Sequence, residues 1–342
     1  MAGFSTRFVD PRPTITIDFT QLRSAGIRSV HMADQMIRQT ASRFRRESAS
    51  FEGANRESLQ SRVEESISRS LRRQMQKEGG SASVLFFERD DHLHNAVRGI
   101  SQMWIVDPLA GSSHLPTTQT YGPPLPIAVS ACHLFDGMPD VGIVSFPFYR
   151  ILFAAMMGES AFFQREKSFL GIPYLGRPVS FKSPSELEEA AHPKGPNSLY
   201  GGIGLNPVSL MTESEPNRIP WFSEALARMG DIRTERCIPY GMVQTATGTF
   251  DYYIHPAPPL FDVLGAMVIA KSAGCDVLFY AGDRKQESIL PLDIARLKAP
   301  TNGINPARLP MMIVARTDIQ KRIARELKLS PAAENGEGRE AE

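Results

Sequence analysis

The sequence is poor in cysteine, in net charge and in long hydrophobic runs. Its 342 residues include three cysteines, and no two of them form a C-x-x-C pair. This pattern suggests neither a disulfide framework nor a zinc site, and it is typical of a protein from a reducing cytoplasm. The net charge of +1 gives no electrostatic reason to expect a nucleic-acid or a membrane partner.

Long apolar segments are also missing. The longest candidate, residues 141–157, is interrupted by Arg150, so it does not reach the length of a membrane-spanning helix. The first residues lack the apolar core of a signal peptide. We therefore expect a cytoplasmic protein without a membrane partner.

Apolar residues at helical spacing predict two amphipathic helices at the start of the chain. The first spans residues 24–46, and the second ends at Gly79 and Gly80. Short apolar runs predict buried strands at 83–87 and 103–107. Three further runs, at 126–135, 141–147 and 150–158, are separated by turn residues and predict an antiparallel meander.

The last third of the sequence alternates between strand and helix patterns. We expect strands at 200–205, 247–254, 276–280 and 310–316, and helices at 260–273 and 317–327. Gly274 is the expected C-terminal cap of the first of these helices, and Thr317 or Asp318 is the expected N-cap of the second. Helices and strands in this order predict a layered α/β or α+β sandwich.

The segment W-I-V-D-P-L-A-G-S-S-H at 104–114 carries the chemical information. A buried strand leads into Asp107, Pro108 fixes the turn, and Gly111 lets the backbone approach a ligand closely. Ser112 and Ser113 could cap a following helix and direct N–H groups at an anion. From the residues alone, this segment could also be a plain turn with a helix cap and no functional role.

This segment resembles the D-P-[I/L]-D-G-T-[T/S]-N signature of the inositol monophosphatase family, including the W-I-[V/I] that precedes it. Two more blocks resemble that family in the same order. Residues 135–163 are similar to its meander, and residues 245–276 to its A-x-G-x-x-D-x-Y … W-D … E-A-G-G block, with Phe261 in place of Trp. The resemblance covers about 25–328 of the chain.

The resemblance implies a five-layered αβαβα sandwich, often a homodimer, that acts on a phosphorylated small molecule with Mg²⁺. It also implies the domain limits. Residues 1–22 form an N-terminal extension, 23–328 the domain with sub-domains 23–180 and 181–328, and 329–342 a disordered tail.

The same resemblance assigns roles to individual residues. The metal ligands that it implies are Glu88, Asp107, the carbonyl of Leu109, and Asp262. The phosphate-binding residues that it implies are Gly111, Ser112, Ser113 and His114, with Asp107 and Ser112 also in catalytic roles. His255 stands where the family often has an acid that binds substrate hydroxyls, and a histidine can serve as acid or base.

Two departures from the family pattern put ordinary phosphatase chemistry in question. Ala110 replaces the second signature Asp, and Gln60 stands near the position of an Asp that helps to place the attacking water. We therefore predict, in this order, three functions. The first is a divergent enzyme that acts on a phosphorylated sugar, polyol or nucleotide, with one Mg²⁺ or by metal-independent chemistry. The second is a non-catalytic binding protein. The third is an ordinary Mg²⁺-dependent hydrolase in which Asp90 or Asp91 supplies the missing ligand.

Overall fold

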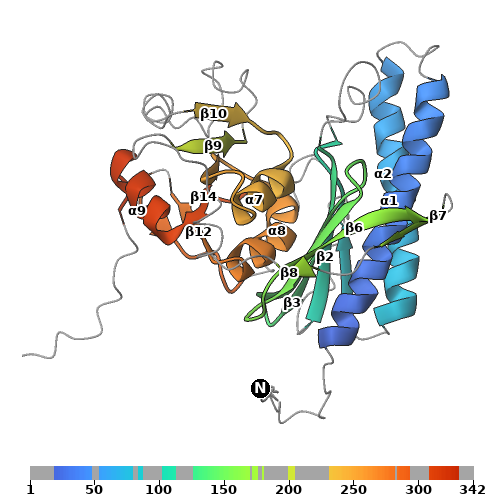
Figure 1. Cartoon of the computed structure of the whole chain (residues 1–342), viewed down its shortest axis with the longest axis horizontal. Coiled ribbons are helices and arrows are strands. Elements are labelled where there is room, and N and C mark those ends of the chain that lie inside the picture. The colour runs from blue at the N-terminus through green and yellow to red at the C-terminus, as the bar shows by residue number, and fades with distance from the viewer. Residues whose placement is uncertain are drawn as a thin grey trace, which may run out of the picture.

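The fold is a stack of alternating helix and sheet layers. The computed structural model of the chain describes residues 19–47, 54–79, 84–87, 102–112, 126–169, 172–175, 179–180, 199–204, 231–281, 283–292 and 308–330. Two long helices cover one sheet, two buried helices separate it from a second sheet, and a short helix covers the far side of that sheet (Figure 1). The predicted αβαβα sandwich is confirmed.

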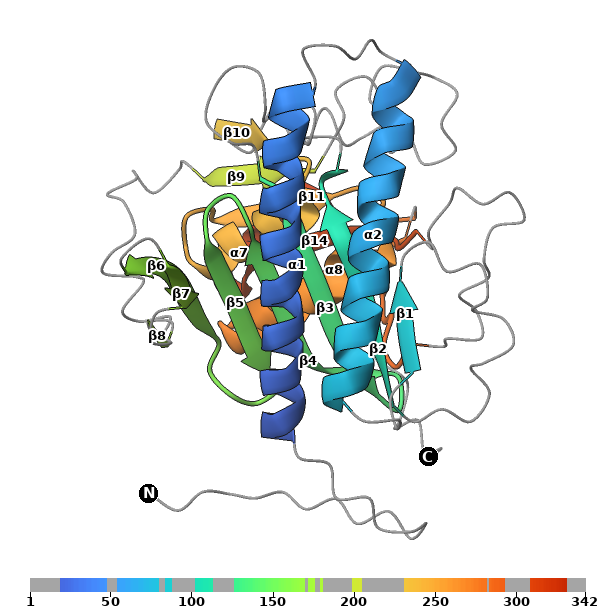
Figure 2. The same cartoon turned by 90° about the vertical axis from the view of Figure 1, so that its right-hand side faces the viewer.

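The first layer consists of α1 (Phe19–Glu47) and α2 (Ala54–Gly79), which lie side by side across one face of the first sheet (Figure 2). Apolar residues recur along each helix at helical spacing, so each helix turns one stripe to the sheet. Val30, Ile37 and Leu71 are fully buried in a core cluster that includes strand residues of the sheet. Both helices were predicted from this spacing.

The first sheet has eight strands in the order β1-β2-β3-β4-β5-β6-β7, with β8 paired to β6. Only β1 and β2 are parallel; the other pairs are antiparallel, including the predicted meander β3-β4-β5. The strands are β1 (Val84–Phe87), β2 (Gln102–Ala110), β3 (Ala128–Phe135), β4 (Met138–Phe146), β5 (Ile151–Met156), β6 (Phe162–Phe169), β7 (Ile172–Leu175) and β8 (Val179–Ser180).

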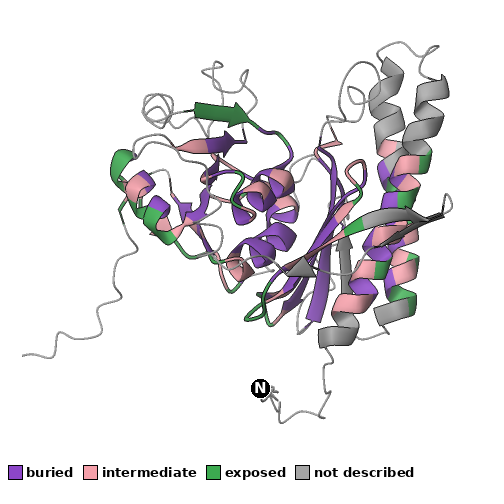
Figure 3. Ribbon diagram, in the orientation of Figure 1, coloured by how far each residue is buried: buried purple, intermediate pink, exposed green. Residues whose placement is uncertain are grey.

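The central layer consists of α7 (Ile238–Ala246) and α8 (Leu260–Ser272), which pack on each other and are largely buried (Figure 3). Helix α8 ends as predicted, with Gly274 in the left-handed conformation at φ +85°. The sequence did not predict α7. A short helix that is buried on most sides carries no amphipathic stripe, so its apolar residues show no helical period.

The second sheet has six strands in the order β10-β9-β11-β14-β12-β13. Strands β10, β9 and β11 are mutually parallel, and the remaining pairs are antiparallel. The strands are β9 (Tyr200–Ile203), β10 (Asp231–Thr234), β11 (Tyr252–His255), β12 (Cys275–Tyr280), β13 (Gln286–Glu287) and β14 (Met311–Arg316). Helix α9 (Thr317–Glu326) packs on β14 and β12.

Two local predictions in this half were wrong. The strand expected from residue 247 begins at Tyr252, because the preceding residues end α7, where the N–H of Thr247 donates to the carbonyl of Val243 at 2.9 Å. The N-cap of α9 is Arg316 rather than Thr317 or Asp318, and no side chain caps this helix. Packing of Ile319 and Ile323 against the sheet fixes the helix instead.

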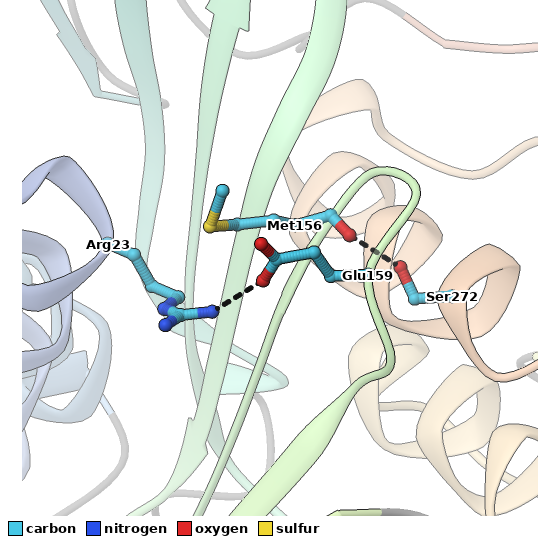
Figure 4. A network of polar contacts seen from close by, with 4 residues as sticks. All are labelled: Arg23, Met156, Glu159 and Ser272. Carbon is cyan, nitrogen blue, oxygen red and sulfur yellow. Dashed lines mark hydrogen bonds and ion pairs between the residues drawn. The ribbon is translucent and has the colours of Figure 1, made fainter. Parts of the chain in front are cut away.

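Polar contacts tie the turn between β5 and β6 to the helix layers on both sides of the first sheet (Figure 4). Arg23 of α1 donates to Glu159 Oε2 at 3.0 Å, and the hydroxyl of Ser272 in α8 donates to the carbonyl of Met156 at 3.1 Å. The guanidinium of Arg23 also lies 5.3 Å from the ring centroid of Phe162. Because the Arg23–Glu159 pair is partly exposed, it stabilises the fold by at most about 1 kcal/mol.

Candidate active site

Asp107 lies in β2 at the point where the strand becomes irregular. The register between β2 and β3 shifts between Asp107 and Ala110, where Pro108 has no backbone N–H for the ladder. The N–H of Leu109 donates to Oδ1 of Asp107 at 2.9 Å. With 1% exposure, the Asp107 carboxyl group is held in a buried, fixed position.

Asp262 lies in the first turn of α8, directly after the proline-rich stretch 256–259. Pro259 is the N-cap, with φ −63° and ψ 142°, so the helix starts at Leu260. A negative side chain is favourable there because the N-terminal end of a helix carries partial positive charge. The carboxyl groups of Asp107 and Asp262 lie close enough to share a proton, and their interaction raises the pKa of Asp107. The structure thus brings together the two acids that the sequence analysis singled out.

The surroundings of Asp107 disfavour its charged form. Burial, the hydrogen bond to Asp262 and the charge of Asp262 raise the pKa of Asp107 well above its ordinary value, and the charge of Glu64 on α2 adds to this. Oδ2 of Asp107 is buried and finds no donor among the described residues. Two carboxyl groups in contact need a proton or a cation between them. Hard oxygen ligands of this kind fit Mg²⁺.

The described residues do not complete a metal site by themselves. Among them, no group of three or more His, Cys, Asp or Glu side chains is placed to hold a metal ion. Glu88, the third predicted carboxylate, lies outside the described residues, as do Asp90 and Asp91. Leu109 is buried beside Asp107, and the role of its carbonyl as a ligand stays a prediction.

Ala110 brings no carboxylate to the site, and its surroundings are filled. Its side chain is buried opposite Ala128 of β3, and its carbonyl accepts a weak hydrogen bond from the thiol of Cys237 at 3.9 Å. Cys237 is the N-cap of α7. The next residue, Gly111, has φ +72°, and a Cβ there would lie 3.0 Å from the Cβ of Cys237. The turn after Asp107 therefore packs directly against the start of α7.

The predicted phosphate-binding residues lie only partly within the described chain. Gly111 forms the turn, and Ser112 follows it in a partly exposed position. Ser113 and His114 lie outside the described residues, and so does the helix expected to begin there. The phosphate-binding roles of these four residues stay predictions.

Glu235 is a buried acid that the sequence analysis missed. It lies between β10 and α7, is 3% exposed, and its Oε1 accepts the N–H of Cys237 at 3.1 Å. Burial raises the pKa of Glu235 to about 7, although hydrogen bonds from the backbone N–H groups of Cys237 and Arg236 and the charge of Arg233 act in the opposite direction. The sequence signal was an acid three residues before Ile238-Pro239, since proline favours the first turn of a helix.

His255 ends β11 and is partly buried. Burial, followed by the nearby charge of Arg308, lowers its pKa to about 3, so the imidazole is neutral at neutral pH. Its Nδ1 accepts the N–H of Ala257 at 3.2 Å, which leaves Nε2 to carry the ring proton. The role of His255 as an acid or base stays a prediction, and its tautomer makes it a hydrogen-bond donor through Nε2.

These groups gather at one edge of the second sheet. Strands β9, β10 and β11 are parallel, so their carboxyl ends lie at the same edge, and α7 and α8 follow β10 and β11 there. A Cβ at Gly204, just after β9, would overlap both the ring of His255 and the hydroxyl of Tyr253. The carboxyl edge of parallel strands is a common place for ligands to bind. Glu235 and His255 therefore lie at the same edge of the second sheet, and α8, with Asp262 in its first turn, follows β11 from this edge.

Comparison with known proteins agrees with this geometry. The sequence profile of the inositol monophosphatase family matches residues 18–308. The chain belongs to the inositol monophosphatase family. No curated protein matches the sequence at a significant level.

Solved structures of inositol monophosphatase-type proteins share the fold at low sequence identity. Inositol monophosphatase II from Staphylococcus aureus is 18% identical with a TM-score of 0.60, and the match covers 90% of this chain and 95% of that one. SuhB from Mycobacterium tuberculosis is 16% identical with a TM-score of 0.59, over 90% and 96%. SaIMPase-II with bound inositol monophosphate is 17% identical with a TM-score of 0.59, over 90% and 94%.

Proposed function

We propose that this inositol monophosphatase-family chain acts on a phosphorylated small molecule, with Asp107 and Asp262 holding one divalent cation against the phosphate. The observation that carries the proposal is the contact between the buried carboxyl group of Asp107 and the partly buried carboxyl group of Asp262, with Oδ2 of Asp107 lacking a donor among the described residues. A cation at this point would balance the pair and attract a phosphate.

Mg²⁺ is the cation that this donor set suits best, because it prefers hard oxygen ligands and accepts waters at the remaining positions. Bound there, it would neutralise charge on the phosphate and polarise it for attack. Asp107 and Asp262 would hold it, together with the carbonyl of Leu109 and with Glu88. Ala110 offers no side-chain oxygen, so we propose one cation site where the family pattern has carboxylates for more.

The substrate class follows from the family. SaIMPase-II has been solved with inositol monophosphate bound, which is a phosphate monoester of a polyol. We propose a phosphorylated sugar, polyol or nucleotide as the substrate of this chain.

A cytoplasmic location and a homodimer belong to the same proposal. None of the described helices is long and apolar enough to cross a membrane.

Ala110 and its packing support a second candidate, a non-catalytic protein that binds phosphorylated ligands. Cys237 and Gly111 occupy the surroundings of Ala110, so the loss of the second carboxylate is built into the local packing. A protein of this kind would bind a phosphorylated ligand and release no phosphate.

The test is phosphate release from inositol monophosphates, sugar phosphates and nucleotides, with and without Mg²⁺. We expect release that depends on Mg²⁺ and is lost in Asp262→Asn. The matched control is Asp318→Asn, which removes an exposed acid from the first turn of α9 and should leave activity unchanged. Binding without release would support the second candidate, and neither binding nor release would contradict both.

A further inference from the structure

Glu235 is a buried acid that is not among the proposed ligands of the cation. It forms no part of the Asp107–Asp262 pair, and it lies outside the three segments in which the resemblance to the family was found. Its carboxyl group is nevertheless fixed, because Oε1 accepts the N–H of Cys237 at 3.1 Å and the backbone carbonyl of Glu235 accepts the hydroxyl of Tyr253 at 3.3 Å. A buried carboxyl group is costly to maintain, so its environment calls for a physical explanation.

Cys237 separates Glu235 from the acid pair. Its N–H is bonded to Glu235, its thiol contacts the carbonyl of Ala110, and the charges of Glu235, Asp262 and Asp107 all raise the pKa of that thiol, after burial itself. Tyr253 gives a second connection, since the charges of both Glu235 and Asp262 act on its buried hydroxyl. The side chain of Cys237 therefore stands between the cation site and Glu235, so a phosphate ester bound at the cation site would reach Glu235 by extending past this one residue.

The groups around Glu235 come from β10, α7, β11 and two connecting segments. They are two arginines and several thiol and phenol groups that are neutral at neutral pH, and the charge of Arg233 lowers the pKa of Glu235. These neighbours are Arg233 of β10, Arg236 next to it in the chain, Cys237 and Tyr240 at the start of α7, Tyr149 between β4 and β5, and Tyr253 of β11. Tyr149 and Tyr240 stack on each other, with ring centroids 5.8 Å apart.

We propose that Glu235 is a catalytic general acid that protonates the leaving oxygen of the phosphate ester. This role rests on the proposed function. In the step, the bond between phosphorus and the ester oxygen breaks, and that oxygen keeps the electron pair and takes the proton of Glu235. A water oxygen bonds to phosphorus, and its proton passes to solvent. The Glu235 carboxylate then regains a proton from solvent.

The pKa of Glu235, which burial raises to about 7, agrees with this role. A general acid works best when its pKa lies near the working pH, because it is then protonated in a useful fraction of molecules and still gives up its proton readily. An alkyl ester needs such an acid, since an alkoxide is a poor leaving group. A p-nitrophenyl ester needs it far less, because p-nitrophenolate is stable in water.

The experiment compares an alkyl ester, glycerol 2-phosphate, with p-nitrophenyl phosphate in the full chain with Mg²⁺. We expect Glu235→Gln to lower kcat for the alkyl ester by about 100-fold, the typical effect of losing a general acid. The loss should be at least about tenfold larger for the alkyl than for the aryl ester. Glu326→Gln, which changes an exposed acid at the end of α9, is the matched control and should leave the ratio unchanged.

The wild-type chain provides a second measurement that does not depend on how the variant folds. The ratio of alkyl to aryl hydrolysis should fall as pH rises through about 7, where Glu235 loses its proton. Equal losses on both esters, or a ratio that does not change with pH, would overturn the role of Glu235 and leave the proposed function standing. If the wild-type chain cleaves neither ester nor any phosphorylated sugar, polyol or nucleotide, the proposed function fails and this role fails with it.

Discussion

The carboxyl groups of Asp107 and Asp262 lie in close contact, although one lies in β2 of the first sheet and the other in the first turn of α8. Two acids in contact repel each other unless a proton or a cation lies between them. Selection for stability alone would not favour this arrangement, because placing the buried carboxyl group of Asp107 against a second acid costs free energy. The pair therefore points to a ligand that the folded chain binds.

Asp107→Asn tests two effects of the acid pair, its effect on stability without metal and its binding of Mg²⁺. In EDTA we expect the variant to melt at a higher temperature than the wild type, because a neutral amide can donate to Asp262 and removes a buried charge. Mg²⁺ should raise the melting temperature of the wild type and not that of the variant. At a concentration 100 times its dissociation constant, Mg²⁺ would stabilise the folded wild type by about 2.7 kcal/mol. Equal Mg²⁺ responses in the two proteins would contradict a cation site at Asp107.

Ala110→Asp tests the loss of the second carboxylate. Without metal, we expect the variant to unfold at a lower temperature than the wild type, since it adds a third acid beside the pair and crowds Cys237. Overpacking of this kind costs about 1–3 kcal/mol. With Mg²⁺, the variant should recover more stability than the wild type gains. Ala110→Asn has nearly the same size without the charge, and it should lose stability and show no added Mg²⁺ response. Thermal unfolding at several Mg²⁺ concentrations measures both.

Gly111→Ala tests how tightly the signature turn packs on α7. The residue has φ +72°, and an added Cβ would lie 3.0 Å from the Cβ of Cys237 and 3.1 Å from the carbonyl oxygen of Pro126. We expect a loss of at least about 2 kcal/mol in the free energy of unfolding, from backbone strain and the clash together. Gly158→Ala is the control, because Gly158 has φ +81° and no atom within 4 Å of an added Cβ. It should lose only about 1 kcal/mol. Urea unfolding that gives equal losses would argue against tight packing at this turn.

The raised pKa of Glu235 predicts a pH-dependent stability difference between the wild type and Glu235→Gln. In the unfolded chain this carboxyl titrates at 4.5, and in the folded protein at about 7. A group whose folded pKa is raised contributes stability that is present below pH 4.5 and lost as pH rises towards 7. Relative to the variant, the wild type should therefore lose up to about 3 kcal/mol over that window and change little above it. Melting temperatures across this pH range measure the difference, and a constant difference would show that Glu235 titrates normally.

The outer helices and the central meander could be predicted from the sequence. The stripes on α1 and α2 are visible because one face of each helix packs inward and leaves a repeat, and β3 to β5 are visible as apolar runs separated by turn residues. Helix α7 was missed for the opposite reason. It is buried on most sides, so nothing in its composition distinguishes it from a strand or an apolar loop.

The residues of the candidate site were also predictable only in part. Asp107 and Asp262 could be singled out because each stands in a segment with a family resemblance, and Ala110 could be seen as a departure from it. Glu235 could not be singled out in this way. Its importance comes from its enclosure between β10, α7 and Tyr253, and one sequence does not reveal which acid becomes buried on folding.

By itself, the sequence determined a layered fold through its local periods, and through the family resemblance it determined the two acids and the absence of the second signature carboxylate at Ala110. Only the tertiary structure decided that the two acids touch, that Cys237 fills the space beside Ala110, and that Glu235 is buried near them. Contact and desolvation depend on how distant segments pack together, and a linear order of residues fixes neither one until the chain has folded.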